Sequence, residues 1–176
     1  MSSELYIGMP NGVVLCVDEG LEHDTFRGRI YHKYSREAIP VSSFWELVRE
    51  MENLFNDIQF PRAGIRDRSF TKEPHPREAQ QQSKGNAPKA PGNIRKEREI
   101  VMSDKNLLKM HGDYGTFIIR VQQRQGGTWQ GRITWVDRNK TVRFRSILEM
   151  IKLIEDGILA EHPELLEEED TPNWDE

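Results

Sequence analysis

The chain has 176 residues, of which 36% are hydrophobic and 31% are charged, and its formal net charge is −4. So much polar surface disfavours one large core and favours two small cores joined by polar chain. Cys16 is the sole cysteine, which excludes an internal disulfide, and no apolar run approaches the roughly 20 residues of a membrane-spanning helix. The Met-Ser-Ser-Glu start lacks the basic and apolar regions of a signal peptide, so we expect a cytoplasmic protein.

Residues 1–60 predict a first strand-strand-strand-helix (βββα) unit. Its strands show the alternation of apolar and polar residues that is typical of a half-buried sheet. We expect them at 13–18, 26–34 and 39–41, with an additional strand at 5–8. Pro10-Asn11-Gly12 is a turn signal ahead of the first long strand. Ser43 is a suitable N-cap for a helix over 44–55, which carries an apolar stripe at helical spacing.

Residues 61–99 predict a disordered basic linker. This segment holds five of the nine prolines, ten basic residues and five acidic ones. Apart from Phe70, it has almost no apolar residue between Ile65 and Ile94 to offset the entropy lost on ordering. The linker is long enough for the flanking units to pack against one another.

Residues 100–160 predict a second βββα unit, preceded by a short helix at 103–110. The expected strands are 117–123, 128–136 and 141–145, joined by turns at Gln125-Gly126-Gly127 and Asp137-Arg138-Asn139-Lys140. Ser146 and Glu149 have the spacing of a capping box, which predicts that a helix begins here. Residues 161–176 carry eight acidic groups and no lysine or arginine, so they are interpreted as an acidic tail that resembles the linker in its lack of structure.

The two units match one another when the chain is shifted by 103 positions. Residues 25–55 then lie over 128–158 without a gap, with seven identities in 31 positions. The apolar rhythm is shared as well, which indicates a tandem repeat. We therefore predict an α+β fold of two repeated βββα units, each an antiparallel sheet with a helix on one face, packed as a pseudo-dimer.

Two segments of the second unit resemble a known group of sequences. They are Thr128-Trp129-Gln130-Gly131 and the helix start Phe144-Arg145-Ser146-Ile147-Leu148-Glu149. This pattern is similar to that of short uncharacterised bacterial proteins, mostly from Firmicutes, and it covers about a quarter of the chain. The resemblance implies a bacterial source and a small module, and it brings no activity with it. In the first unit Phe26-Arg27 and Ser42-Ser43 depart from the pattern.

Residue patterns for catalysis or metal binding are weak throughout the sequence. The five histidines are scattered and have no metal-ligand spacing with Cys16 or with one another. Cys16 lies in an apolar strand, which favours a core residue over a nucleophile. Gly126-Gly127 is a turn and not a phosphate-binding loop, and the glutamates of the helices fall outside the apolar stripes. We expect a non-enzymatic protein without a cofactor or a metal.

One sheet face of the second unit collects arginines. If the apolar positions face the helix, strand alternation places five arginines and no acidic residue on the opposite face. These are Arg120, Arg124, Arg132, Arg143 and Arg145. Like charges on neighbouring strands disfavour one another, so this face favours an anionic partner. The first unit matches it in part through Arg29, but has Pro40 and Ser42 in place of the last two arginines.

Several roles fit this arginine-rich face. It could be an ordinary solvated face, be covered by the acidic tail, contact another protein, or bind an anionic ligand. We predict a binding or regulatory protein with a protein-interaction surface or self-association through the duplicated units. The alternative is nucleic acid or an anionic nucleotide on the arginine-rich face. Trp129 and Trp135 share the parity of core residues, whereas Trp45 lies beside the helix stripe and is expected to pack against the other unit.

Overall fold

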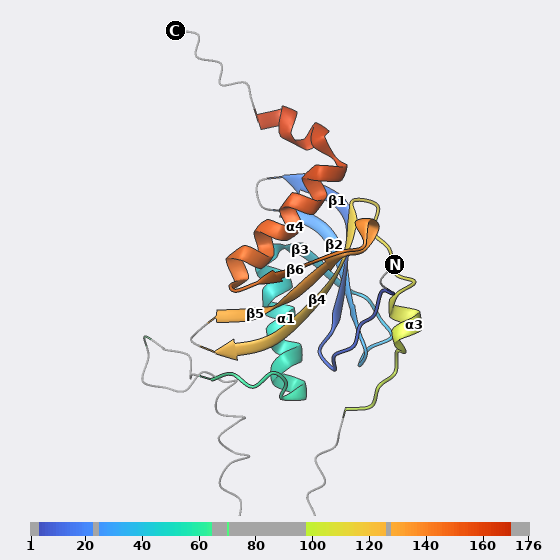
Figure 1. The fold of residues 1–176 in the computed structure, drawn as a ribbon, viewed down its shortest axis with the longest axis vertical. Helices are drawn as coiled ribbons and strands as arrows, with labels where there is room; N and C mark the ends of the chain where they lie inside the picture. The colour runs from blue at the N-terminus through green and yellow to red at the C-terminus, as the bar shows by residue number, and fades with distance from the viewer. Residues whose placement is uncertain (1–3, 23–24, 65–69, 71–97, 126–127, 170–176) are drawn as a thin grey trace, which may run out of the picture.

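The computed structural model describes residues 4–22, 25–64, 70, 98–125 and 128–169. They form an α+β fold whose six antiparallel strands make one sheet, in the order β3-β2-β1-β4-β5-β6 (Figure 1). The elements are β1 (Val13–Glu22), β2 (Thr25–His32), β3 (Ile39–Ser43), α1 (Phe44–Ile58), α3 (Asp104–Leu107), β4 (Gly115–Gln125), β5 (Thr128–Trp135), η1 (Val136–Arg138), β6 (Lys140–Phe144), α4 (Ile147–Glu161) and η2 (Pro163–Glu169). The predicted α+β class is therefore confirmed.

The sheet is continuous because β1 and β4 pair with each other at its centre. Leu15 is the Cα partner of Phe117, and Val13 is the partner of Ile119. All four side chains face the same side and belong to one buried cluster that extends across β1, β2, β4 and β5. The expectation of two separate small cores is wrong, because this central strand pair joins the two halves into one.

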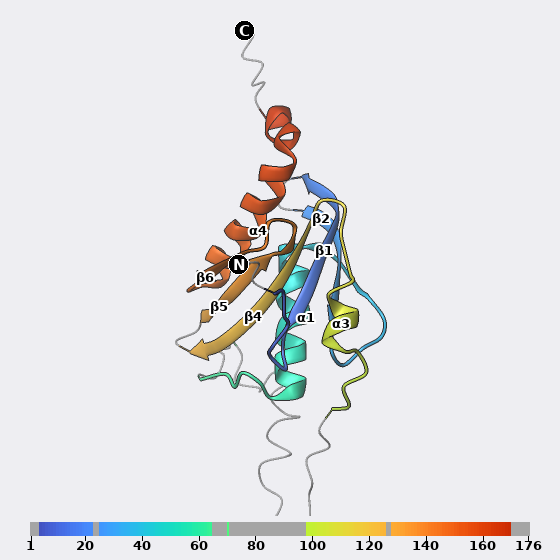
Figure 2. The same ribbon diagram turned by 45° about the vertical axis from the view of Figure 1, so that its right-hand side comes forward.

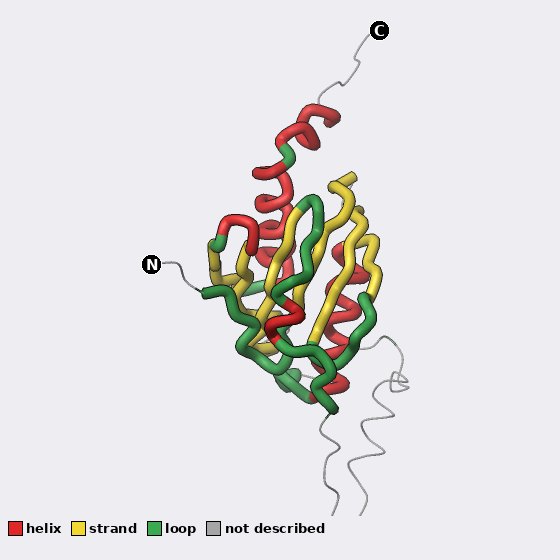
Figure 3. Tube along the Cα trace, turned by 90° about the vertical axis from the view of Figure 1, so that its right-hand side faces the viewer, coloured by secondary structure: helices red, strands yellow, loops and turns green. Residues whose placement is uncertain are grey.

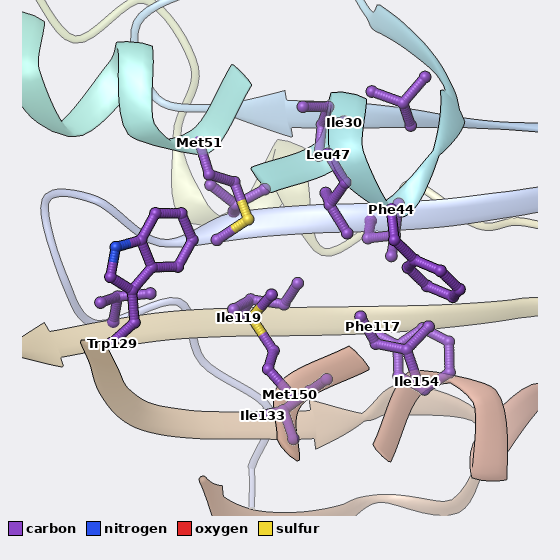
Figure 4. Close-up of a cluster of buried hydrophobic side chains, with 14 of the residues drawn as sticks. Ile30, Phe44, Leu47, Met51, Phe117, Ile119, Trp129, Ile133, Met150 and Ile154 are labelled. Atoms are coloured by element: carbon purple, nitrogen blue, oxygen red, sulfur yellow. The ribbon is translucent and has the colours of Figure 1, made fainter. Parts of the chain in front are cut away.

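Helices α1 and α4 both lie on one face of the sheet (Figures 1 and 2). Each has 15 residues and begins after a serine N-cap, whose hydroxyl accepts a hydrogen bond from the backbone N–H three residues on. The buried side chains Leu47 and Met51 of α1 and Met150 and Ile154 of α4 meet the sheet residues in the core (Figure 4). Trp129 is 5% exposed and stacks edge-on against Phe55, as expected of a core residue.

The opposite face of the sheet carries neither of the two long helices, and in that sense we call it the helix-free face; it is also partly covered. Residues 4–12 and the segment 101–112, which includes α3, lie over the strands there (Figure 3). They bury a second apolar cluster made of Ile7, Val14, Cys16, Tyr31, Met102, Leu107 and Ile118. Both faces near β1 are thus shielded from water, which explains the nearly continuous apolar run Val13–Val17.

The structure corrects several details of the predicted elements. Residues 5–8 are not a strand, although the turn after them forms, with the Gly12 N–H donating to the Met9 carbonyl at 3.1 Å. Trp45 is 72% exposed and does not pack against the other unit. Residues 163–169 of the acidic tail continue α4 as η2, and Leu165 packs on the core.

Most of the predicted linker, the Gly126-Gly127 turn and the end of the tail lie outside the described residues. Within the described ranges, no helix has the combined length and apolarity needed to span a membrane.

Candidate functional site

Three arginines form a row across the second half of the sheet. Arg120 of β4 is the Cα partner of Arg132 of β5, and Arg132 is the partner of Arg143 of β6. Residues paired in this way point to the same face, and neighbouring strands are about 4.8 Å apart, so the row spans about 10 Å. We call Arg120, Arg132 and Arg143 the arginine row. It lies on the helix-free face, because the adjacent residues Ile119 and Ile133 belong to the core cluster between the sheet and the helices α1 and α4.

Arg120 is the buried end of the row. It is 5% exposed, and its guanidinium donates to the Tyr6 carbonyl oxygen at 2.9 Å and to the Thr134 hydroxyl at 2.5 Å. The guanidinium carbon lies 4.8 Å from the centre of the Tyr6 ring. Its Nε is buried without a hydrogen-bond partner among the described groups. Burial lowers the pKa of Arg120, and the charge of Arg132 lowers it further.

Arg132 and Arg143 are the exposed members of the row. Among the described residues, no acidic side chain forms an ion pair with either of them. Arg145 directly follows β6 and is also exposed. Its Nε is 3.6 Å from the Glu149 carboxylate, a surface contact that contributes little to stability. The exposed part of the row therefore offers uncompensated positive charge to solvent.

A groove of about 540 Å³ opens beside the arginine row. It is lined by Gln122, Gln123, Gln130, Gly131, Arg143, Phe144, Arg145 and Glu149. Its walls thus combine amide groups, which both donate and accept hydrogen bonds, with two guanidinium groups that only donate. The Glu149 carboxylate in this lining already has a structural role, because one of its oxygens accepts a hydrogen bond from the Arg145 backbone N–H at 2.7 Å.

The prediction for Arg124 is wrong, because this side chain is not on the arginine-rich face. The β4–β5 ladder shifts register after Val121, so Gln122 is an extra residue and Arg124 becomes the partner of the core residue Trp129. Arg124 is 7% exposed and lies on the helix side. It donates to the Pro61 carbonyl at 2.7 Å and to the Asn56 side chain at 2.9 Å, which fixes the end of α1 against the sheet.

The same register in the first half of the sheet carries different residues. Cys16, Arg29 and Pro40 are consecutive Cα partners across β1, β2 and β3. Arg29, the predicted site residue of this half, is neutralised by Asp18, whose carboxylate oxygens lie 2.6 and 2.7 Å from its Nε and Nη2. These hydrogen bonds raise the pKa of Arg29 above its usual range. The basic neighbours are paired as well, Arg27 with Glu19 and Lys33 with Asp104.

The acid that neutralises Arg29 has no counterpart in the second half. Asp18 is the extra residue of a register shift in β1 that follows Val17, and Gln122 is the extra residue of the shift in β4. A neutral amide therefore stands where the first half has a carboxylate. No protein-family model, curated protein or solved structure matches the chain.

Two titratable groups lie apart from this surface and are buried in neutral form. Burial raises the pKa of the Cys16 thiol to about 12 and lowers the pKa of His32 to about 4. The His32 Nδ1 accepts a hydrogen bond from the Tyr34 backbone N–H at 3.1 Å, which favours the neutral ring. The prediction that Cys16 is a core residue is confirmed. Among the described side chains, no group of three or more His, Cys, Asp or Glu residues is suited to hold a metal.

Tyr6 is the residue of this site that sequence reasoning missed. The sequence predicts a strand at 5–8, whereas the structure has an irregular segment there, and no pattern indicates that Tyr6 contacts Arg120, 114 positions away. The available signal is indirect: the turn at Pro10-Asn11-Gly12 indicates that the segment carrying Tyr6 folds back toward β1.

Proposed function

We propose that this chain is a non-enzymatic binding protein whose ligand is nucleic acid, held through the arginine row and Arg145. The observation that carries the proposal is the row itself, in which three arginines are consecutive cross-strand partners and the exposed two have no acidic partner among the described residues. Guanidinium groups match phosphate oxygens in a fork geometry. The exposed guanidinium groups of Arg132, Arg143 and Arg145 suit neighbouring phosphates of one backbone, whereas the buried Arg120 is not accessible to them.

The row costs stability in the free protein, which supports a role outside folding. Directly opposed like charges on neighbouring strands destabilise a sheet. Arg120 adds a second cost because its Nε is buried without a partner among the described groups. An anionic ligand would offset the repulsion among the guanidinium groups, although it could not reach the buried Nε of Arg120. An ordinary solvated face would gain nothing from placing arginines side by side.

The two halves of the sheet also support a division of roles between duplicated units packed as a pseudo-dimer. From either edge, the sheet starts with the third strand of one unit, followed by the second and first strands of that unit. The first residues of α1 and α4 are 103 positions apart, and so are their last residues. Glycine is required at the same register in both halves, because a Cβ on Gly28 or Gly131 would meet the carbonyl of Cys16 or Arg120. At matching positions of the two ladders, the second half has Arg120 and Arg143 where the first half has Cys16 and Pro40. We therefore assign binding to the second unit.

The proposal is tested by the affinity of the full chain for a fluorescein-labelled oligonucleotide, measured by fluorescence polarisation. The Arg132→Ala/Arg143→Ala variant should bind at least tenfold more weakly at low salt. Its matched control is Arg27→Ala/Arg49→Ala, which removes the same charge from exposed arginines outside the row. Equal affinities in the two variants would show that net charge alone is responsible, and would end the proposal.

A protein contact is the second candidate, and one observation favours it. Trp45 and Leu148 occupy the second position of α1 and α4, and they are 72% and 61% exposed. Exposed large apolar side chains at matching places on one side of the molecule are typical of an interaction surface. Self-association through them would shift the sedimentation coefficient of the protein with concentration. Trp45→Ser/Leu148→Ser should remove that shift, and its persistence would argue against this contact.

A further inference from the structure

An exposed aromatic ring lies at the buried end of the arginine row. The Tyr6 side chain belongs to a residue that is 57% exposed, although its neighbour Ile7 is completely buried. The ring is held by two contacts. Arg120 lies 4.8 Å from its centre, and Gly8, at φ +71°, is so close that a Cβ there would come within 2.6 Å of two ring carbons. The ring is therefore exposed and yet fixed in place.

The segment that carries Tyr6 is anchored at Tyr6 itself and at the residues that follow it. Before the sheet begins, the buried Asn11 side chain donates to the Val121 carbonyl at 2.7 Å, and Ile7 packs in the apolar cluster of the helix-free face. Arg120 holds the Tyr6 carbonyl and is in turn held by Thr134, which also hydrogen-bonds Thr141 at 2.8 Å. These links fix Tyr6 relative to Arg120, the buried end of the arginine row.

A rigid exposed ring beside a row of guanidinium groups matches a particular class of nucleic acid. Single-stranded DNA or RNA presents its bases, which stack on aromatic side chains while a basic surface follows the backbone. A duplex keeps its bases stacked inside and offers only phosphates and groove edges. We infer that Tyr6 is a base-stacking residue and that the nucleic acid bound by the arginine row is single-stranded. This inference rests on the proposed function.

The groove at the other end of the row is consistent with unpaired bases. The amides of Gln122 and Gln130 line it beside Arg143. Amide groups form hydrogen bonds with base edges that are accessible only when the bases are unpaired or in a groove. A single strand crossing from Tyr6 to this groove would place its phosphates along the arginine row.

The inference is tested with three labelled probes on the intact chain: a 12-nucleotide single strand of mixed sequence, the corresponding duplex, and inorganic polyphosphate as an anion without bases. The variants are Tyr6→Leu, which keeps the carbonyl that Arg120 uses, and Tyr6→Phe, which keeps the ring. We expect the single strand to bind more tightly than either other probe. Tyr6→Leu should weaken single-strand binding about fivefold or more and leave polyphosphate binding within twofold, whereas Tyr6→Phe should bind like the parent chain.

The outcomes separate this inference from the proposed function. Equal affinity for the single strand and the duplex, or an unchanged single-strand affinity in Tyr6→Leu, would overturn the base-stacking role while the arginine row remained a phosphate site. Loss of polyphosphate and oligonucleotide binding in Arg132→Ala/Arg143→Ala would still support the proposed function in that case. If the parent chain bound none of the three probes, both would be refuted. Thermal unfolding of Tyr6→Leu verifies that it is folded.

Discussion

Introducing into the second half the carboxylate that the first half has should weaken anion binding at the arginine row. Gln122→Asp places a carboxylate at the position where Asp18 neutralises Arg29 with contacts of 2.6 and 2.7 Å. We expect it to pair with Arg132 and to repel a bound phosphate. A unit charge about 6 Å from a phosphate costs about 0.7 kcal/mol at the dielectric constant of water and about 3 kcal/mol at an effective value of 20. Oligonucleotide binding should therefore weaken about 3- to 100-fold.

The assay is fluorescence polarisation with the oligonucleotide at a fixed low salt concentration. The control variant is Arg27→Ala, which changes the net charge by the same amount outside the row. The pairing itself contributes little to stability, about 0–1 kcal/mol for so exposed a pair, so the midpoint of denaturation should hardly change. If the Gln122→Asp variant bound the oligonucleotide as tightly as the Arg27→Ala variant, the inference that Asp18 prevents Arg29 from binding anions would be refuted.

Three further predictions concern the core and the sheet. The pKa of His32 is lowered to about 4 in the folded chain and is about 6.5 in the unfolded chain, so the unfolded state binds more protons between these pH values. The free energy of unfolding should therefore be highest above pH 6.5 and fall by at most about 3 kcal/mol toward pH 4. Urea titrations at several pH values measure this, and a His32→Gln variant should lack that part of the slope. The Cys16 thiol, with its pKa near 12, should react with a thiol reagent only after unfolding, so rapid reaction at neutral pH would contradict its burial. Gly131→Ala should destabilise the fold by about 2 kcal/mol or more in denaturant titrations, because its Cβ would press on the Arg120 carbonyl, whereas a surface control such as Gln123→Ala should stay within about 0.5 kcal/mol.

Local patterns predicted the strands and helices well because they record local causes. Ser43 and Ser146 cap their helices as the spacing of serine and glutamate indicates, and the alternation around Trp129 correctly identifies the face that is buried. Arg120, Arg132 and Arg143 followed from the same alternation, since no irregularity intervenes between them in the ladder.

Non-local contacts decided what the sequence did not reveal. The extra residue Gln122 exchanges the two faces of the sheet for the residues that follow it in β4. Arg124, which was expected on the surface, therefore lies on the helix side and hydrogen-bonds Asn56 near the end of α1. The pairing of β1 with β4 depends on complementarity across about 100 residues, and it makes one core out of two expected ones. The contact of Tyr6 with Arg120 is likewise non-local, because it joins residues 114 positions apart through a segment that was expected to be a strand and is irregular.

The central claim, that the arginine row binds the phosphates of a nucleic acid, is tested most directly by the salt dependence of oligonucleotide binding. Affinities of the parent chain, of Arg132→Ala/Arg143→Ala and of Arg27→Ala/Arg49→Ala are measured between about 50 and 200 mM salt. The slope of log affinity against log salt should decrease by about two in the row variant and remain unchanged in the control. A slope that is the same in all three proteins would contradict the claim.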